Sequence, residues 1–218
     1  MSVSRSVRFR VRPAPRAIAF SAVLSLLVLA PAAVAQGADA AHTIRRAFHA
    51  QGVVDVHVDK GDASVVPSDA DSVVVEWSGT NADHASAIVR FAGDTAYVET
   101  TGKYEHVRYL IHLPRSSDVR LRSTAGDIRV GAFDGDEDIA LHIGDLQVEV
   151  GDPASYAHVE ASTRVGDLNQ SVFQTSTHGW LGKSIAVHGA GTRALTAHVG
   201  VGDLVLARAS GRTADAGS

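Results

Sequence analysis

Ala125-Gly126-Asp127-Ile128 is the first of four copies of a phrase that decides the fold; the others are Ile143-Gly144-Asp145-Leu146, Val165-Gly166-Asp167-Leu168 and Val201-Gly202-Asp203-Leu204. The steps between their glycines are 18, 22 and 36 residues, and the longest step contains a degenerate copy, Gly182-Lys183-Ser184. An earlier echo stands at Gly61-Asp62. Repeats of about 20 residues indicate one structural unit per copy, with neighbouring units sharing a core.

Apolar and polar residues alternate on both sides of each copy, as in Ile139, Leu141 and Ile143 before the second one. This period of two predicts strands with one buried face. Ile143 and Leu146 are both expected to point inward, as are Val165 and Leu168, although three residues separate each pair. A straight strand cannot do this, so the Gly-Asp pair should form a bulge or corner, where glycine tolerates unusual dihedral angles. The predicted structural corners are Gly126, Gly144, Gly166 and Gly202.

The predicted fold is therefore all-β, a single-stranded β-solenoid with shorter and less regular strands in the N-terminal half. Residues 50–208 are expected to form this one domain, preceded by a flexible leader at 36–49. The tail at 209–218 has few apolar residues and is expected to be disordered. No helical periodicity is found after residue 35.

Residues 1–35 have the pattern of a secretory signal peptide. Five arginines without an acid precede the apolar run Ala17–Ala30, and Ala33-Val34-Ala35 offers small residues for cleavage. A membrane anchor is the alternative, but a span needs about 18–20 apolar residues. We expect an exported protein, periplasmic or extracellular, with no membrane span after cleavage. The chain has no cysteine, so it lacks the lipid-acceptor residue of a lipoprotein, and that class is excluded.

The charge balance excludes some partners. The whole chain has 20 basic and 24 acidic residues, so removal of the five signal arginines leaves 15 against 24, a net charge of −9. An acidic protein of this kind is not expected to bind nucleic acid. The expected partner is an unknown envelope protein or a glycan.

The phrase places one acid in each repeat, namely Asp127, Asp145, Asp167 and Asp203. Stacked strands lie about 4.8 Å apart, and two carboxylates at about 5 Å repel by ~1 kcal/mol in water. Turn amides, basic neighbours such as Arg129 and Arg164, or a cation such as calcium must relieve this repulsion. The favoured interpretation is that each aspartate caps its own corner, with no metal and no cofactor. A calcium ladder is the alternative, although no EF-hand loop is found.

No catalytic residue is predicted. The eleven histidines form no His-x-x-x-His pair, and they are expected on outward positions, with a zinc site built across repeats as the alternative. The acidic run Asp134, Asp136, Glu137 and Asp138 is expected to face solvent in a turn. A carbohydrate-binding or carbohydrate-cleaving β-helix protein is the second hypothesis. It would require a groove lined by acids and aromatic residues, and aromatics make up only 6% of the chain.

A family resemblance follows from the order of these elements. A strand, a Gly-Asp pair and a strand lead to Leu113-Pro114, and the segment from Val119 to Val130 then reads Val-x-Leu-x-Ser-x-x-Gly-Asp-Ile-x-Val. This order resembles the bacterial exported putative-adhesin family, a β-solenoid domain of unknown function, over roughly residues 50–207. The resemblance implies an envelope or surface role and supplies no catalytic motif. Gly182-Lys183-Ser184 departs from it. The interpretation is thus an exported, non-catalytic interaction or structural protein of the cell envelope.

Overall fold

The computed structural model describes residues 42–49, 51–102, 106–173, 175–180 and 182–209. The chain divides into two units, Met1–Gln36 and Gly37–Ser218, and every described residue belongs to the second. The predicted signal peptide and all of the predicted tail except Ala209 therefore lie outside the described residues. Among those described, no helix is long and apolar enough to cross a bilayer.

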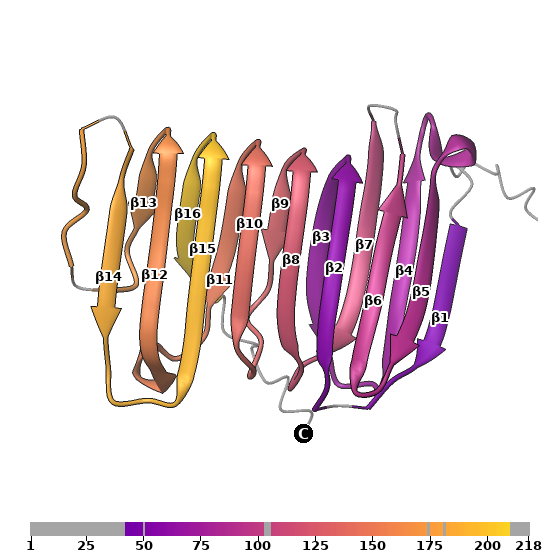
Figure 1. Cartoon of the computed structure of the whole chain (residues 1–218), viewed down its shortest axis with the longest axis horizontal. Helices are drawn as coiled ribbons and strands as arrows, with labels where there is room; N and C mark the ends of the chain where they lie inside the picture. The colour runs from indigo at the N-terminus through magenta and orange to yellow at the C-terminus, as the bar shows by residue number, and fades with distance from the viewer. Residues whose placement is uncertain (1–41, 50, 103–105, 174, 181, 210–218) are drawn as a thin grey trace, which may run out of the picture. The chain divides into compact units, whose positions relative to one another are not determined.

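Two eight-stranded mixed sheets make up the described part of the second unit (Figure 1). Sheet A contains, in spatial order, β1 (His42–Ala47), β4 (Ser72–Gly79), β7 (Val107–Pro114), β3 (Asp62–Ser68), β9 (Ile128–Val130), β11 (Leu146–Val150), β16 (Leu204–Arg208) and β13 (Leu168–Gln170). Sheet B contains β14 (Ser184–His188), β12 (Tyr156–Val165), β15 (Arg193–Val201), β10 (Glu137–Ile143), β8 (Asp118–Ala125), β2 (Val53–Lys60), β6 (Thr95–Thr101) and β5 (Ser86–Ala92). Two 3-10 turns, η1 (Ala82–His84) and η2 (Pro153–Ser155), complete the described elements. The all-β prediction is confirmed.

Each Gly-Asp pair joins one strand of sheet B to one strand of sheet A, and we call such a strand–corner–strand unit a rung. The rungs are β2–β3, β8–β9, β10–β11, β12–β13 and β15–β16. Alternate side chains of both strands are buried, as Ile139 and Leu141 are in β10 and Leu146 and Val148 in β11. They meet in one hydrophobic cluster that runs through all five rungs.

The rungs are not stacked in chain order. The last one, β15–β16, lies between β10–β11 and β12–β13, and the first, β2–β3, lies between β8–β9 and the strands β6 and β7 (Figure 1). Neighbouring rungs pair in parallel, whereas β1, β4, β5 and β14 pair antiparallel at the ends of the sheets. A single-stranded β-solenoid, in which rungs would follow one another in chain order, is not confirmed. Every rung has the same type of Gly-Asp corner and the same apolar alternation. The local sequence pattern therefore does not specify which rungs lie next to one another.

Residues 42–47 form a strand, which corrects the expected flexible leader at 36–49 over this range. β1 pairs along its whole length with β4, from His42 opposite Trp77 to Ala47 opposite Ser72. Ile44 packs against the core and Phe48 is buried. The open edge of β4 supplies backbone partners that a leader in solution would lack.

Candidate functional site

The Gly-Asp corners lie in one column at one end of the rungs. Their glycines have φ between +118° and +136°, a region that side chains rarely adopt. A methyl group on Gly202 would lie 2.0 Å from the carbonyl oxygen of Gly144, and one on Gly126 would lie 2.2 Å from that of Gly61. Each corner therefore requires glycine twice, for its own dihedral angle and for the backbone of the neighbouring rung. The earlier echo at Gly61 is a full member of the column.

The aspartates of the column form a ladder of hydrogen bonds. Four of the five carboxylates accept a bond from the backbone N–H of the next aspartate in the stack: Asp127 N–H to Asp62 at 3.1 Å, Asp145 N–H to Asp127 at 3.3 Å, Asp203 N–H to Asp145 at 3.0 Å and Asp167 N–H to Asp203 at 2.8 Å. These four side chains cap the neighbouring corner, whereas the sequence led to the expectation that each aspartate caps its own corner. We call these five residues the Asp ladder.

Lys183 stands where the ladder ends. Asp167 is the last member, and the Lys183 Nζ lies 3.9 Å from its Oδ1. The degenerate copy Gly182-Lys183-Ser184 does not build a rung, because it leads into β14, which runs antiparallel to β12. The lysine places a positive charge beside the terminal carboxylate. A further aspartate would have no neighbouring rung to cap, because in the described ranges no strand of sheet A lies beyond β13.

The residue before each glycine is placed differently from the prediction. Ile143, Val201 and Val165 are 50%, 48% and 42% exposed. They follow the inward phase of their strands but stand at the rim, beyond the part of the core that the opposite sheet covers. Inward side chains nearest the corner are Leu141 before it and Leu146 after it.

A buried acid lies at the other end of these strands. Glu137 is 2% exposed at the start of β10, so the expected solvent-facing run Asp134 to Asp138 is wrong at this residue. Its Oε1 accepts the Phe133 N–H at 3.2 Å. Burial raises the pKa of the Glu137 carboxyl to about 7, with smaller opposing effects from the Phe133 N–H, the Arg193 charge and the Tyr156 hydroxyl. Glu137 is two residues from Ile139, so the period of two already placed it inward.

Arg193 holds the loop ends around this acid together. Its guanidinium donates to the carbonyls of Gly135 and Phe133, to Ser155 Oγ at 3.2 Å and to the Tyr156 hydroxyl at 3.1 Å. It also lies over the Tyr156 ring, 4.5 Å from the centroid. These bonds join the starts of β10, β12 and β15.

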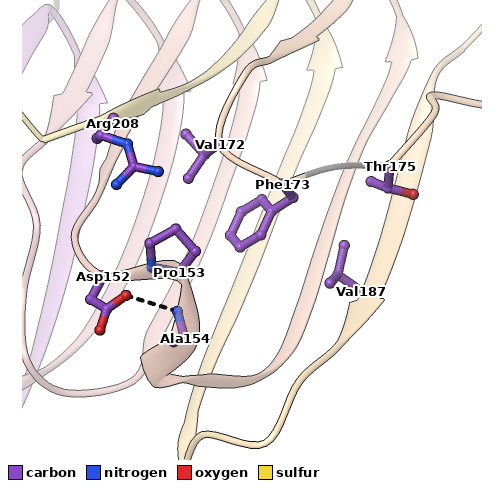
Figure 2. A pocket seen from close by; sticks show the side chains of 8 residues that line it. All are labelled: Asp152, Pro153, Ala154, Val172, Phe173, Thr175, Val187 and Arg208. Carbon is purple, nitrogen blue, oxygen red and sulfur yellow. Dashed lines mark hydrogen bonds between the residues drawn. The ribbon is translucent and has the colours of Figure 1, made fainter.

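Two pockets lie at opposite ends of the sheets. Figure 2 shows the first, about 460 Å³, where Val172, Phe173 and Val187 face one another and Asp152 bonds the Ala154 N–H at 3.0 Å. The second, about 700 Å³, contains the stacked rings of Phe48 and Phe91, with Asp71 and Asp94 among its lining residues. Its lining includes no tyrosine or tryptophan, so it does not supply the aromatic row that the carbohydrate hypothesis requires.

A third depression, about 290 Å³, lies on the outward face of sheet B. It crosses the strands β2, β8, β10, β15 and β12, and its charged or titratable lining residues are His57, Arg122, His142, Arg164 and His198. These histidines were expected on outward positions, but their spacing in the sequence does not indicate that they line one depression. We call this feature the sheet-B depression. In the described ranges, no group of three or more His, Cys, Asp or Glu side chains is arranged to hold a metal ion.

No family model matches the chain, and no curated protein matches its sequence. The fold is similar to a putative cell adhesion protein from Clostridium sporogenes, with 11% identity and a TM-score of 0.48, over 78% of this chain and 100% of that one. Putative adhesins from Bacteroides fragilis (11% identity, TM-score 0.34, 78% and 98% of the chains) and Parabacteroides distasonis (9%, 0.25, 78% and 71%) are also similar. At these values the likeness assigns neither an activity nor a partner.

Proposed function

We propose that the protein is a non-catalytic interaction module of the cell envelope, exported by its N-terminal segment, and that it binds its partner through the outward face of sheet B. One observation carries this proposal. The repeated Gly-Asp residues are used to join rungs, so the repeats build a scaffold, while the outward residues of sheet B differ from strand to strand.

That face presents two straight rows of side chains across eight strands. The first row is Ile88, Glu99, His57, Arg122, Ala140, His198, Ser162 and Ser184. The second is Arg90, Tyr97, Asp55, Arg120, Asp138, Thr196, Glu160 and Ala186. Several members pair across strands, as Arg90 does with Glu99 and Arg122 with Asp138 at 2.5 Å. A row held at the spacing of a sheet is a pre-organised surface, which lowers the entropic cost of binding.

We also infer that the parallel stack of rungs is a β-solenoid variant in which rungs are added out of chain order. The parallel register supports this, because the residues around Gly126, Gly144 and Gly202 stay level from rung to rung. Export rests on the sequence pattern of residues 1–35. N-terminal sequencing of the protein recovered from the envelope should begin at or near Gln36, and an intact Met1 would contradict it.

Thr196→Arg tests the binding face. Thr196 lies between Asp138 and Glu160 in the second row, so arginine adds bulk without placing like charges together. Val205→Arg is the matched control, since Val205 is 36% exposed on sheet A of the same rung, between Gln147 and Asn169.

We expect Thr196→Arg to lower retention of the labelled protein on envelope preparations at least tenfold, and Val205→Arg to leave it unchanged. Equal retention of both variants and the unaltered protein would overturn the proposed face. Release of sugar ends from a polysaccharide panel by the purified protein would overturn the non-catalytic assignment in favour of carbohydrate cleavage.

A further inference from the structure

The lining of the sheet-B depression has basic side chains and no acidic ones, although the chain as a whole has an excess of acids. Its arginines are Arg122 and Arg164. Arg122 is paired with Asp138, which lies outside the lining. Arg164 forms no ion pair with a described residue. A concave site lined by one sign of charge concentrates ions of the other sign.

The depression exists because small residues occupy two outward positions. Ala140 stands in the first row between Arg122 and His198. Gly200, two residues after His198 on β15, carries no side chain, and a methyl group there would lie 2.5 Å from the carbonyl oxygen of His142. Longer side chains at these positions would fill the space that the arginines and histidines surround.

The donors around this space are held in place. Arg122 donates to the carbonyls of Leu121 and Asp138 at 3.0 and 2.9 Å and to the Asp138 carboxylate at 2.5 Å. These three bonds leave two of the five N–H groups of its guanidinium. His198 Nδ1 lies 2.9 Å from Ser162 Oγ, which fixes the ring and leaves Nε2 for another partner. The two remaining N–H groups of the fixed Arg122 guanidinium favour a ligand that accepts hydrogen bonds.

From this arrangement we propose that the sheet-B depression binds a single oxyanion group, a carboxylate, sulfate or phosphate. The guanidinium fork matches the oxygens of these groups. A volume of about 290 Å³ is at or below the lower end of the range for drug-sized ligands, about 300–1,000 Å³, so the site holds one small charged group. The inference rests on the proposed function, since it names the chemistry that the same face recognises.

The test follows the backbone amides of Gly200 and His142 by NMR during titration with sodium sulfate, sodium phosphate, galacturonate and uncharged galactose, at one ionic strength set with sodium chloride. The three anions should shift both amides in a saturable way, and galactose should not. Sulfate or phosphate binding as tightly as galacturonate assigns the site to a free oxyanion. At least tenfold tighter binding of galacturonate assigns it to a carboxylate carried on a sugar.

Three variants make the result specific. Arg164→Gln removes a charge from the depression, and Ala140→Glu places a competing carboxylate inside it, so each should weaken anion binding at least tenfold. Arg120→Gln is the matched control, because Arg120 lies in the second row, outside the depression. Equal losses for Arg120→Gln and Arg164→Gln, no shift with any anion, or an equal shift with galactose would overturn the proposal.

The outcome is separable from that of the proposed function. If Thr196→Arg abolishes envelope retention but no anion shifts the Gly200 amide, the binding face stands and the oxyanion site is wrong. If anions bind but Thr196→Arg is retained like the unaltered protein, the oxyanion site stands and the binding face is wrong.

Discussion

The two ends of the rungs treat acidic side chains in opposite ways. At the corners, the five carboxylates of the Asp ladder are exposed, and four of them accept a backbone N–H from the next rung. At the other end, Glu137 is buried, with a pKa raised to about 7 and Arg193 beside it. Water and amides make the exposed column tolerable, because repulsion between neighbours there is only ~1 kcal/mol. The buried acid must instead hold a proton or incur the cost of a buried charge.

The number of acidic side chains in a region of this fold is therefore a poor guide to what that region does. The carboxylates of the column that suggests a cation site bond the amides of neighbouring rungs, and within the acidic run only Glu137 is buried in the core. In both places, the position of the acid relative to backbone amides and solvent decides its role.

Gly202→Val, at the corner end of the rungs, should lower the free energy of unfolding more than the other substitutions. Valine would take a φ of +135° and meet the Gly144 backbone at 2.0 Å, so we expect a loss of at least about 3 kcal/mol in the free energy of unfolding. Gly93→Ala is the control, since its φ of +57° is also positive but nothing lies within 4 Å of a methyl group there. Urea unfolding of both variants checks this, and equal losses would contradict the account of the corner.

At the other end of the rungs, Glu137→Gln tests whether the buried carboxyl makes the stability of the protein depend on pH. The folded pKa of about 7 lies above the ordinary 4.5, so the folded state favours the protonated acid and loses stability as pH rises from 4.5 through 7. This pKa shift corresponds to a loss of about 3 kcal/mol in the free energy of unfolding between pH 4.5 and pH 8. Glutamine cannot ionise, and it keeps an oxygen for the Phe133 N–H.

We therefore expect Glu137→Gln to be more stable than the unaltered protein at pH 8, and to lose much of its pH dependence between pH 5 and 8. Urea unfolding at both pH values measures this. Asp134→Asn is the control in the same turn, because Asp134 is exposed. An unchanged pH dependence in Glu137→Gln would show that this acid does not carry the linkage.

Lys183→Gln should have the smallest effect. The ion pair with Asp167 is 3.9 Å long, and the two side chains are 35% and 74% exposed. Pairs of this kind contribute at most about 0.5 kcal/mol, and salt screens them. Thermal melts at low salt should show a slight decrease that disappears in 0.5 M sodium chloride. A larger decrease that persists in salt would mean that Lys183 supports the last rung by packing.

The local pattern predicted much of the scaffold. Alternating apolar residues and the Gly-Asp phrase located the strands and the corners, because both depend on a few neighbouring residues. Stacking order could not be read, since every rung offers the same corner. The sheet-B depression was missed for that reason: that Arg164 and His57 line one depression follows only once the order of strands is known. The predicted burial of Ile143 was wrong. Periodicity shows which side chains of a strand point inward, but it does not show where along the strand the opposite sheet stops covering them.

The central claim is that every aspartate of the ladder except the last caps the next rung, and Asp145→Ala tests it most directly. Asp145 Oδ1 accepts the Asp203 N–H, whereas the Asp145 N–H is bonded to Asp127. By NMR, the Asp203 amide should shift and exchange faster with solvent in this variant, while the Asp127 amide, bonded to Asp62, should stay as it was. An unchanged Asp203 amide, or a response to calcium that Asp145→Ala abolishes, would contradict the ladder and restore the cation site.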